Sequence, residues 1–191
     1  MDIVLSSSSP RRRKLLSKIK RKFEIAKPSP LAKIPKGNAK NTTKNYAEYK
    51  SVWAALRNPG KICIGADTLI EFNGKIIGKP ENAKHAKKII NSLNDKKFLV
   101  YTSVCISYFP GKGKIKKKIW SERASVKFRK INAGEIRKYI KSGKWKGKAG
   151  GFNINEMPVK GWVEKVEGDK NVVIGLPMKK LWREIKGMKK L

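Results

Sequence analysis

The chain has 191 residues, 39% of them hydrophobic, which is enough for a single domain with a buried core, and we expect one domain over residues 1–191. Its formal net charge of +33 predicts attraction to polyanions, but apolar runs along the whole length exclude a wholly disordered chain. Only 9 of the 47 basic residues are arginine and the lysines are dispersed, which argues against a protein that reads nucleic-acid sequence.

The first third of the chain alternates strand and helix patterns. Residues 2–6 predict a short buried strand, residues 10–21 a helix, and residues 22–27 a second strand. A loop rich in Pro and Gly is expected over residues 28–41, followed by a helix over residues 43–57. The expected apolar stripe of that helix is Tyr49, Val52, Trp53 and Leu56.

From residue 62 on, hairpins and crossovers are mixed. A strand at 62–67 leads into residues 68–78, where Asn73-Gly74 between two apolar runs predicts a hairpin. The remaining predicted strands are 99–109, 115–131, 162–168 and 171–175, and the remaining predicted helices are 80–93, 131–143 with Asn132 as its cap, and 177–186. This order of elements indicates an α/β fold with a mixed central sheet and flanking helices.

The two cysteines and the single histidine exclude several kinds of site. Cys63 and Cys105 each lie in an apolar run without a CxxC spacing, so we expect buried free thiols in a reducing compartment. His85 lies off the apolar face of its helix and is expected to be exposed, which argues against zinc sites and a Ser-His triad. No run has the length of a membrane span or the order of a secretion signal, so we expect a cytoplasmic protein without a membrane partner.

Residues 5–16, LSSSSPRRRKLL, place hydroxyls and guanidinium groups at the start of a helix. Ser9 is the expected N-cap and Pro10 the first helical residue. The free N–H groups and the dipole of a helix N-terminus favour an anion, and Ser and Arg side chains donate to phosphate oxygens. A capped helix with a basic surface explains the same stretch, so both interpretations stay open here.

Asp67 follows the apolar run CIGA and is one of only 14 acidic residues. Nothing beside it in the sequence would stabilise a buried charge. The carboxyl end of a strand is where α/β sheets bind ligands, so Asp67 suits a general base or a metal ligand. If the strand continues, Glu71 lies on the same face. The alternative is that Asp67 merely caps a turn.

Three lysines occupy positions that would suit a phosphate. Lys50 shares a helix face with Ala47 and Ala54, whose small side chains leave room for a ligand. Lys79 lies between a strand and a proline, and Lys148 lies in GKAGG, where glycines allow close backbone approach. In a chain with this much lysine, each alone is also explained as a solvated surface residue.

Seven motifs in this order resemble the Maf family of nucleotide pyrophosphatases: LSSSSPRRRKLL, AEYKS, GADTLI, IIGKP, YTSV, the GKAGG loop and EGDKNVVIGLP. The resemblance extends from about residue 3 to residue 182. It implies a fold like that of inosine triphosphate pyrophosphatase, with two lobes around a nucleotide cleft, often as a homodimer. SPRR and GADT resemble the branch acting on dTTP and UTP more than the branch acting on methylated guanine nucleotides, which tends to have Trp after the proline.

The resemblance also implies an activity and a set of site residues. The reaction is metal-assisted hydrolysis of a nucleoside triphosphate between the α and β phosphates, with Mg²⁺ or Mn²⁺ offsetting the phosphate charge. Asp67 would activate water and is the candidate metal ligand, Thr68 would lie in the substrate pocket, and Asn155 would contact the base. The other implied substrate-binding residues are Ser7, Arg11, Arg12, Lys50, Lys79 and Lys148.

The sequence departs from the family pattern in two places. Members usually carry an acidic residue after the second strand, but residues 26–46 contain none, so one metal-side carboxylate is missing unless Glu48 or Glu71 replaces it. The motif DKAG-aromatic-G-I-Q appears as GKAGGFNIN. Asn155 keeps the final amide on a shorter arm, which leaves the choice of base open.

Two functions of different classes follow. The first is a housekeeping pyrophosphatase that clears pyrimidine or modified nucleoside triphosphates, in which Ser7, Arg11 and Arg12 face Asp67 across one cleft while Arg13 points to solvent. The second is a non-catalytic protein that binds RNA or a division complex, with the missing acidic residue as a mark of lost catalysis.

Overall fold

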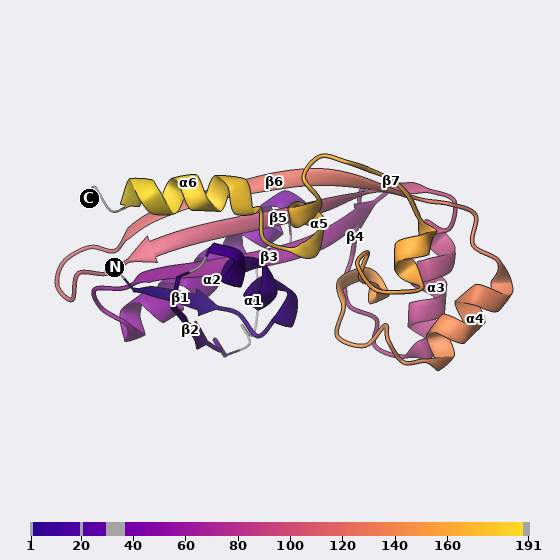
Figure 1. The fold of residues 1–191 in the computed structure, drawn as a ribbon, viewed down its shortest axis with the longest axis horizontal. Helices are drawn as coiled ribbons and strands as arrows, with labels where there is room; N and C mark the ends of the chain where they lie inside the picture. Colours follow the sequence, from indigo (N-terminus) through magenta and orange to yellow (C-terminus); the bar gives the residue numbers. More distant parts are fainter. Residues whose placement is uncertain (1, 20, 30–36, 189–191) are drawn as a thin grey trace. The chain divides into compact units, whose positions relative to one another are not determined.

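The computed structural model describes residues 2–19, 21–29 and 37–188 (Figure 1). The strands are β1 Ile3–Ser6, β2 Phe23–Ala26, β3 Ile62–Phe72, β4 Lys75–Ile77, β5 Lys97–Tyr108, β6 Lys116–Phe128 and β7 Val163–Glu167. The α-helices are α1 Pro10–Leu16, α2 Ala39–Arg57, α3 Ala83–Leu93, α4 Ala133–Lys141, α5 Lys170–Ile174 and α6 Met178–Met188. Within the described residues, the strands form one sheet of seven in the order β2-β1-β3-β5-β6-β7, with β4 paired to β3. The expected α/β fold around a mixed sheet is confirmed.

The chain divides into two compact units. Unit 1 comprises Met1–Asp67, Thr102–Glu122 and Gly175–Leu191, and unit 2 comprises Thr68–Tyr101 and Arg123–Ile174. Three strands, β3, β5 and β6, contribute residues to both units. The sequence pattern gives no sign of this division, because each boundary falls inside an uninterrupted strand or next to a helix end.

The parallel part of the sheet lies in unit 1. Its strand order changes direction at β1, because β2 is added on one side of β1 and β3 on the other. β1 pairs in parallel with β2 on one side and with β3 on the other, and Ser6 lies opposite Gly65 of β3. The chain passes through α1 to reach β2, and through α2 to reach β3. Such a change of strand order is the place where open α/β sheets bind ligands, at the carboxyl ends of the strands. Ser7 and Asp67 both lie at this edge.

Helix α1 begins as the sequence predicts and ends earlier. Ser9 is the N-cap, its side chain accepts from the backbone N–H of Arg12 at 3.5 Å, and Pro10 is the first helical residue. The α-helix stops at Leu16 rather than continuing to residue 21, and a 3₁₀ turn follows over Ser17–Ile19. The Ser17 hydroxyl donates to the Lys14 carbonyl at 2.9 Å, a local bond of the kind that competes with the helix.

Helix α2 begins four residues before the predicted start. Asn38 caps it, with its side-chain oxygen accepting from the N–H of Asn41 at 2.9 Å. The predicted loop over residues 28–41 is therefore shorter, and its residues 30–36 lie outside the described residues. The predicted apolar stripe was wrong, since Leu56 is 51% exposed. The buried residues of α2 are instead small: Ala39, Thr43, Ala47, Ser51, Ala54 and Ala55.

Gly65 explains why small residues face the sheet. A Cβ atom at this position would lie 2.2 Å from the Ala47 carbonyl oxygen and 2.5 Å from the Ser51 nitrogen. The backbone of α2 therefore lies directly against β3, and large side chains cannot fit between them. Hydroxyl pairs join α2 to the next strand, β5, since Ser51 Oγ donates to Ser107 Oγ at 2.6 Å and Thr43 Oγ1 lies 2.7 Å from Ser103 Oγ.

In unit 2, turn and helix-cap residues in the sequence predicted most of the element boundaries discussed below. Asn73 (φ 50°) and Gly74 (φ 71°) form the hairpin turn between β3 and β4, as predicted. Asn132 caps α4, also as predicted, and the structure adds a capping box with Glu135. Helix α3 starts at Ala83 rather than at residue 80, because Asn82 is its N-cap and accepts from the His85 N–H at 2.8 Å.

The strand predicted at residues 171–175 was wrong. These residues belong largely to the short helix α5. Asp169 starts the helix, because its side-chain oxygen accepts from the Asn171 N–H at 2.8 Å and its carbonyl from the Val172 N–H at 2.9 Å. The β-branched run in NVVIG favours a strand, but this carboxylate cap favours a turn of helix, and the cap prevails.

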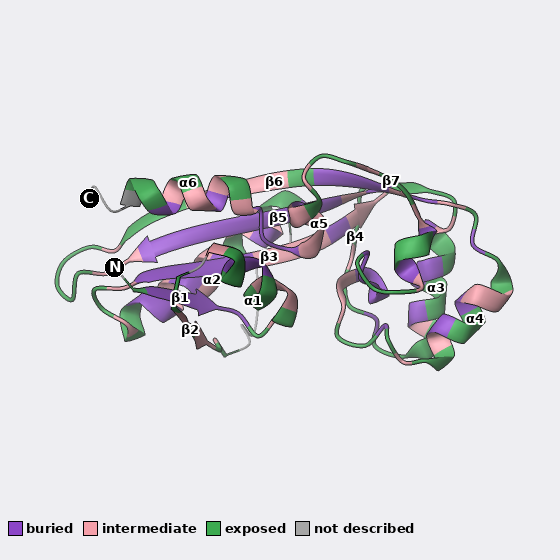
Figure 2. Cartoon of the chain, viewed as in Figure 1, coloured by how far each residue is buried: buried purple, intermediate pink, exposed green. Residues whose placement is uncertain are grey.

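Buried positions occur in both units (Figure 2), and most of the buried side chains are apolar. In unit 2, edge-to-face aromatic contacts are frequent, and the ring centroid of Phe128 lies 5.0 Å from those of Phe98 and Phe152.

Cys63 and Cys105 are free and buried, as expected, and burial raises the pKa of Cys63 to about 12. The side chain of His85 is 41% exposed. Among the described helices, none has the length and apolar character needed to cross a membrane.

Candidate phosphate-binding and catalytic site

Asp67 is held by a lysine at the end of the parallel strands in unit 1. The Nζ atom of Lys50 donates to Asp67 Oδ1 at 2.6 Å and to the Ala66 carbonyl oxygen at 3.3 Å. The two side chains are 20% and 17% exposed, so the pair lies at the surface edge of the core. Lys50 lies on α2 between Ala47 and Ser51, the two residues of the helix that lie against Gly65 of β3. The close approach therefore places the ammonium group on the carboxylate.

Ser7 follows β1 at the same end of the parallel strands, and it contacts Arg12 of α1. Ser7 is 4% exposed, and its Oγ atom accepts from the Ser9 N–H at 3.2 Å and from Arg12 Nη1 at 3.5 Å. The Arg12 Nε atom donates to the Gly175 carbonyl oxygen at 2.8 Å. The pKa of Arg12 is lowered, mainly by burial of the guanidinium group. The nearby charge of Asp67 opposes this shift, and the charge of Arg11 adds to it. Arg12 thus lies within electrostatic reach of both residues.

Within unit 1, the structure brings together the predicted residues Ser7, Arg12, Lys50 and Asp67, with Arg11 beside Arg12. Arg11 is half-buried, whereas Arg13 is exposed, which agrees with the expected difference between them. Lys50 and Arg12 lie near Asp67, and Arg11 lies beside Arg12, so this end of unit 1 carries an excess of positive charge. Such a site suits a ligand with several negative charges, such as a triphosphate.

Lys79 and Lys148 lie on two segments of unit 2 that are hydrogen-bonded to each other. The Gly150 N–H donates to the Gly78 carbonyl oxygen at 2.9 Å, one residue before Lys79. Gly150 adopts a φ of 64°, which favours glycine, and its buried position leaves no room for a side chain. Lys79 is exposed, whereas the side chain of Lys148 is only 15% exposed. The two lysines are therefore neighbours in the fold, although 69 residues separate them in sequence.

Glu156 was missed by the sequence analysis. Its carboxylate forms an ion pair with Lys148 and accepts from Asn153 Nδ2 at 2.5 Å. Asn155, the residue expected to contact the base, is exposed, and its backbone N–H donates to Asn153 Oδ1 at 3.2 Å. Loop contacts of this kind have no periodicity, so no sequence pattern could have indicated Glu156. Thr68 is half-buried in β3, directly after Asp67.

The donors in unit 1 fit a metal ion only together with phosphate oxygens. In the described part of the chain, no three or more His, Cys, Asp or Glu side chains form a group that could hold a metal. Glu48 forms an ion pair with Lys117, and Glu71 lies four residues beyond Asp67 on β3, about 13 Å at the rise of a strand. Asp67 is therefore the one candidate metal-binding carboxylate among these three. This fits Mg²⁺ in nucleotide sites, which is commonly bound by one or two carboxylates plus substrate phosphates.

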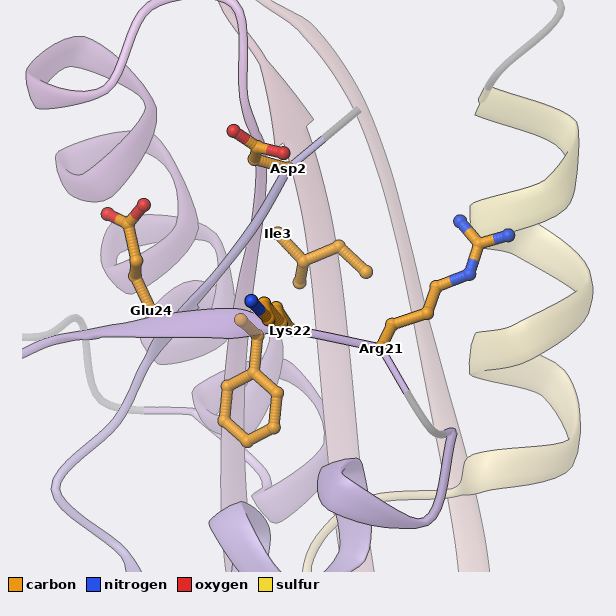
Figure 3. Close-up of a pocket in the computed structure, with 6 residues that line it drawn as sticks. Asp2, Ile3, Arg21, Lys22 and Glu24 are labelled. Carbon is orange, nitrogen blue, oxygen red and sulfur yellow. The ribbon is translucent and has the colours of Figure 1, made fainter.

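A separate cavity of about 580 Å³ lies at the other end of the parallel strands (Figure 3). Its lining residues are Asp2, Ile3, Arg21, Lys22, Phe23 and Glu24. The cavity mixes acidic, basic and apolar groups at the amino ends of β1 and β2, and it contains none of the predicted site residues. The guanidinium of Arg21 lies 5.2 Å from the centre of the Trp182 ring.

Comparisons with known proteins identify the family of this chain. Residues 2–188 match the family model described as "Maf-like protein". The dTTP/UTP pyrophosphatase of Pyrococcus furiosus is 37% identical over 179 residues, covering 92% of this chain and 90% of that protein. The dTTP/UTP pyrophosphatase of Pyrococcus horikoshii is 36% identical over 182 residues, covering 94% and 92%.

Among solved structures, the Staphylococcus aureus Ham1 protein matches with a TM-score of 0.47 and 17% identity, covering 67% of this chain and 72% of that one. The family match spans nearly the whole chain, and the relatives are similar over nearly their own full length. The resemblance carried by the seven ordered motifs is confirmed, and the chain belongs to the Maf family.

Proposed function

We propose that this chain is a metal-dependent nucleoside triphosphate pyrophosphatase that acts on dTTP, UTP or a modified nucleotide. The products are a nucleoside monophosphate and pyrophosphate. The observation that carries the proposal is the group of cations around Asp67 at the switch point between β1 and β3. Similar proteins that are named dTTP/UTP pyrophosphatase support the choice of substrate. Residues 1–191 act as one catalytic domain. A homodimer is proposed from the family resemblance alone, and a cytoplasmic location from the sequence pattern.

The phosphates are bound by groups that unit 1 holds in place before substrate arrives. Arg12 is fixed by its bonds to Ser7 and Gly175, and the start of α1 adds backbone donors beside it. Arg11 and Lys50 supply further positive charge. Because these donors are already oriented and partly desolvated, little reorganisation is needed when charge develops on the leaving pyrophosphate.

Asp67 acts as the general base. It takes a proton from water as the water oxygen forms a bond to the α-phosphorus, and the bond from that phosphorus to the bridging oxygen breaks. Pyrophosphate leaves with the electron pair of the broken bond. Lys50 orients the carboxylate through Oδ1. A divalent cation such as Mg²⁺ or Mn²⁺, held by Asp67 and phosphate oxygens, would neutralise phosphate charge. We assign contacts with the remaining phosphates and the nucleoside to Thr68, Lys79, Lys148 and Asn155.

The direct test is incubation of the purified protein with Mg²⁺ or Mn²⁺ and a panel of nucleoside triphosphates, including methylated and other modified bases. We expect pyrophosphate and monophosphate in equal amounts, with the highest kcat/KM for dTTP and UTP. Release of orthophosphate would contradict cleavage between the α and β phosphates. No turnover of any nucleotide, combined with tight salt-sensitive RNA binding, would favour the non-catalytic alternative, which the acid-free segment 26–46 suggests.

Alanine substitutions of the three arginines should separate a specific site from a charge patch. Arg12→Ala should lower kcat/KM by about 100-fold and Arg11→Ala by about 10-fold, because hydrogen bonds to charged groups contribute about 1.5–3 kcal/mol each. Arg13→Ala removes the same charge from an exposed position and should change kcat/KM by about twofold or less. Steady-state kinetics at two salt concentrations measures the three effects. Equal losses for all three variants would indicate a diffuse patch.

A further inference from the structure

The carbonyl group of Gly175 occupies a fixed position beside the phosphate-binding end of unit 1. Gly175 follows the last residue of α5 and adopts a φ of 116°, a conformation that favours glycine. Gly175 itself is buried, as are Leu176 and Pro177, which connect it to α6. The Leu181 N–H donates to the Pro177 carbonyl at 3.1 Å and anchors this connection to the helix. The carbonyl oxygen of Gly175 is therefore held by its surroundings.

This oxygen accepts the hydrogen bond from Arg12 Nε at 2.8 Å, which joins residues 163 positions apart. A guanidinium group is planar and donates from Nε and from its two terminal nitrogens. With Nε bound to a carbonyl and Nη1 bound to Ser7, the plane of the group is fixed. These two bonds therefore set the direction in which the remaining N–H groups of Arg12 point.

We propose that the main-chain carbonyl of Gly175 is a positioning group that sets the orientation in which Arg12 binds phosphate. The inference rests on the proposed function, because it assigns Arg12 a phosphate ligand. Glycine is required at this position because another residue would be strained at this φ, and relief of that strain rotates the carbonyl away from Nε. The C-terminal segment thereby takes part in substrate binding without contacting substrate.

The test compares Gly175→Ala with Gly111→Ala. Gly111 also belongs to unit 1, has a φ of 98°, and would bring a Cβ no closer than 3.9 Å to its nearest described neighbour, Pro59. Both substitutions introduce the same kind of backbone strain, but only the first disturbs Arg12. We expect Gly175→Ala to lower kcat/KM by about tenfold, the effect of one hydrogen bond to a charged group. Gly111→Ala should leave kcat/KM unchanged.

A double-mutant cycle separates positioning from general destabilisation. Arg12→Lys keeps the charge but has no Nε–H donor, so the bond to Gly175 is already lost in this variant. We expect Gly175→Ala to reduce kcat/KM in the wild-type background but to have an effect of about twofold or less in the Arg12→Lys background. Additive effects of the two substitutions, or a Gly175→Ala variant that behaves like Gly111→Ala, would overturn the proposal and leave the proposed function intact.

Binding of inorganic tripolyphosphate, measured by calorimetry on the same four proteins and the Gly111→Ala control, does not depend on turnover. The same coupling in these affinities would support the positioning role even if no nucleotide is hydrolysed, in which case only the proposed function fails. A wild-type protein that neither hydrolyses nucleotides nor binds tripolyphosphate would overturn both.

Discussion

Asp67→Asn is expected to lower the rate of pyrophosphate release by about 10³-fold, within the range that general-base catalysis contributes. The amide keeps the size of the carboxylate and can still accept a hydrogen bond from Lys50, which lies 2.6 Å away in the wild-type protein. It cannot take a proton from water. The measurement is kcat for dTTP or UTP at saturating Mg²⁺, with pyrophosphate detected by a coupled assay.

Asp2→Asn is the matched control for this substitution. This substitution removes the same charge from unit 1. Asp2, however, lines the cavity at the amino end of β1 and does not lie at the switch point. Its kcat should stay within twofold of wild type, roughly the size of a screened surface effect. Thermal unfolding of both variants checks that the loss is chemical. If Asp67→Asn retains more than a tenth of wild-type activity while remaining folded, Asp67 is not the base.

Gly65→Ala is expected to destabilise the protein by about 3 kcal/mol, at the upper end of the usual cost of overpacking. The added Cβ would lie 2.2 Å from the Ala47 carbonyl oxygen and 2.5 Å from the Ser51 nitrogen. Both are main-chain atoms, so no side chain can rotate away, and α2 itself must shift. Lys50 lies between these two contacts on the helix. We therefore expect kcat/KM to fall as well, even at temperatures where the variant is fully folded.

Urea unfolding and kinetics at 25 °C measure these two effects, with Gly37→Ala as the control. Gly37 also lies in unit 1 and has ordinary space around an added Cβ, whose nearest neighbour is Asn41 Cβ at 3.7 Å. Its free energy of unfolding should change by less than about 1 kcal/mol. A Gly65→Ala protein with wild-type stability would show that α2 does not depend on the close contact with β3.

The elements that sequence predicted correctly are those fixed by local chemistry. Ser9 and Pro10 define the start of α1, Asn73-Gly74 the β3–β4 hairpin, and Asn132 the start of α4. In each case, the residues that make the structure lie within three or four positions of one another. Hydrogen bonds over such distances are visible in the sequence.

The errors arose where a distant segment decides the outcome. The buried face of α2 is set by Gly65, a residue eight positions after the end of the helix, and not by the larger apolar side chains of the helix itself. Without the fold, Leu56 has more apolar surface than Ala47 and is the natural choice for the core. Close backbone contact reverses that preference, because only small residues fit.

The candidate site divides in the same way. Asp67, Lys50, Ser7 and Arg12 could be proposed from ordered motifs, and the structure places them at one end of the parallel strands. The Gly175 carbonyl could not be proposed, because a main-chain group carries no signature in residue type. Glu156 was also hidden, since a carboxylate in an irregular loop has no fixed spacing from Lys148.

The division of the chain between the two units has a consequence for how the protein is made. Unit 2 has all of its residues once the ribosome has added residue 174, whereas unit 1 also requires the stretch Gly175–Leu191, which is synthesised later. Domains usually mature in order from the N-terminus during translation. Here β1, with the serines and arginines that follow it, must wait for this later stretch, and Arg12 gains its Gly175 partner only after residue 175 has been added. A nascent chain that has not reached residue 175 therefore lacks the complete phosphate site.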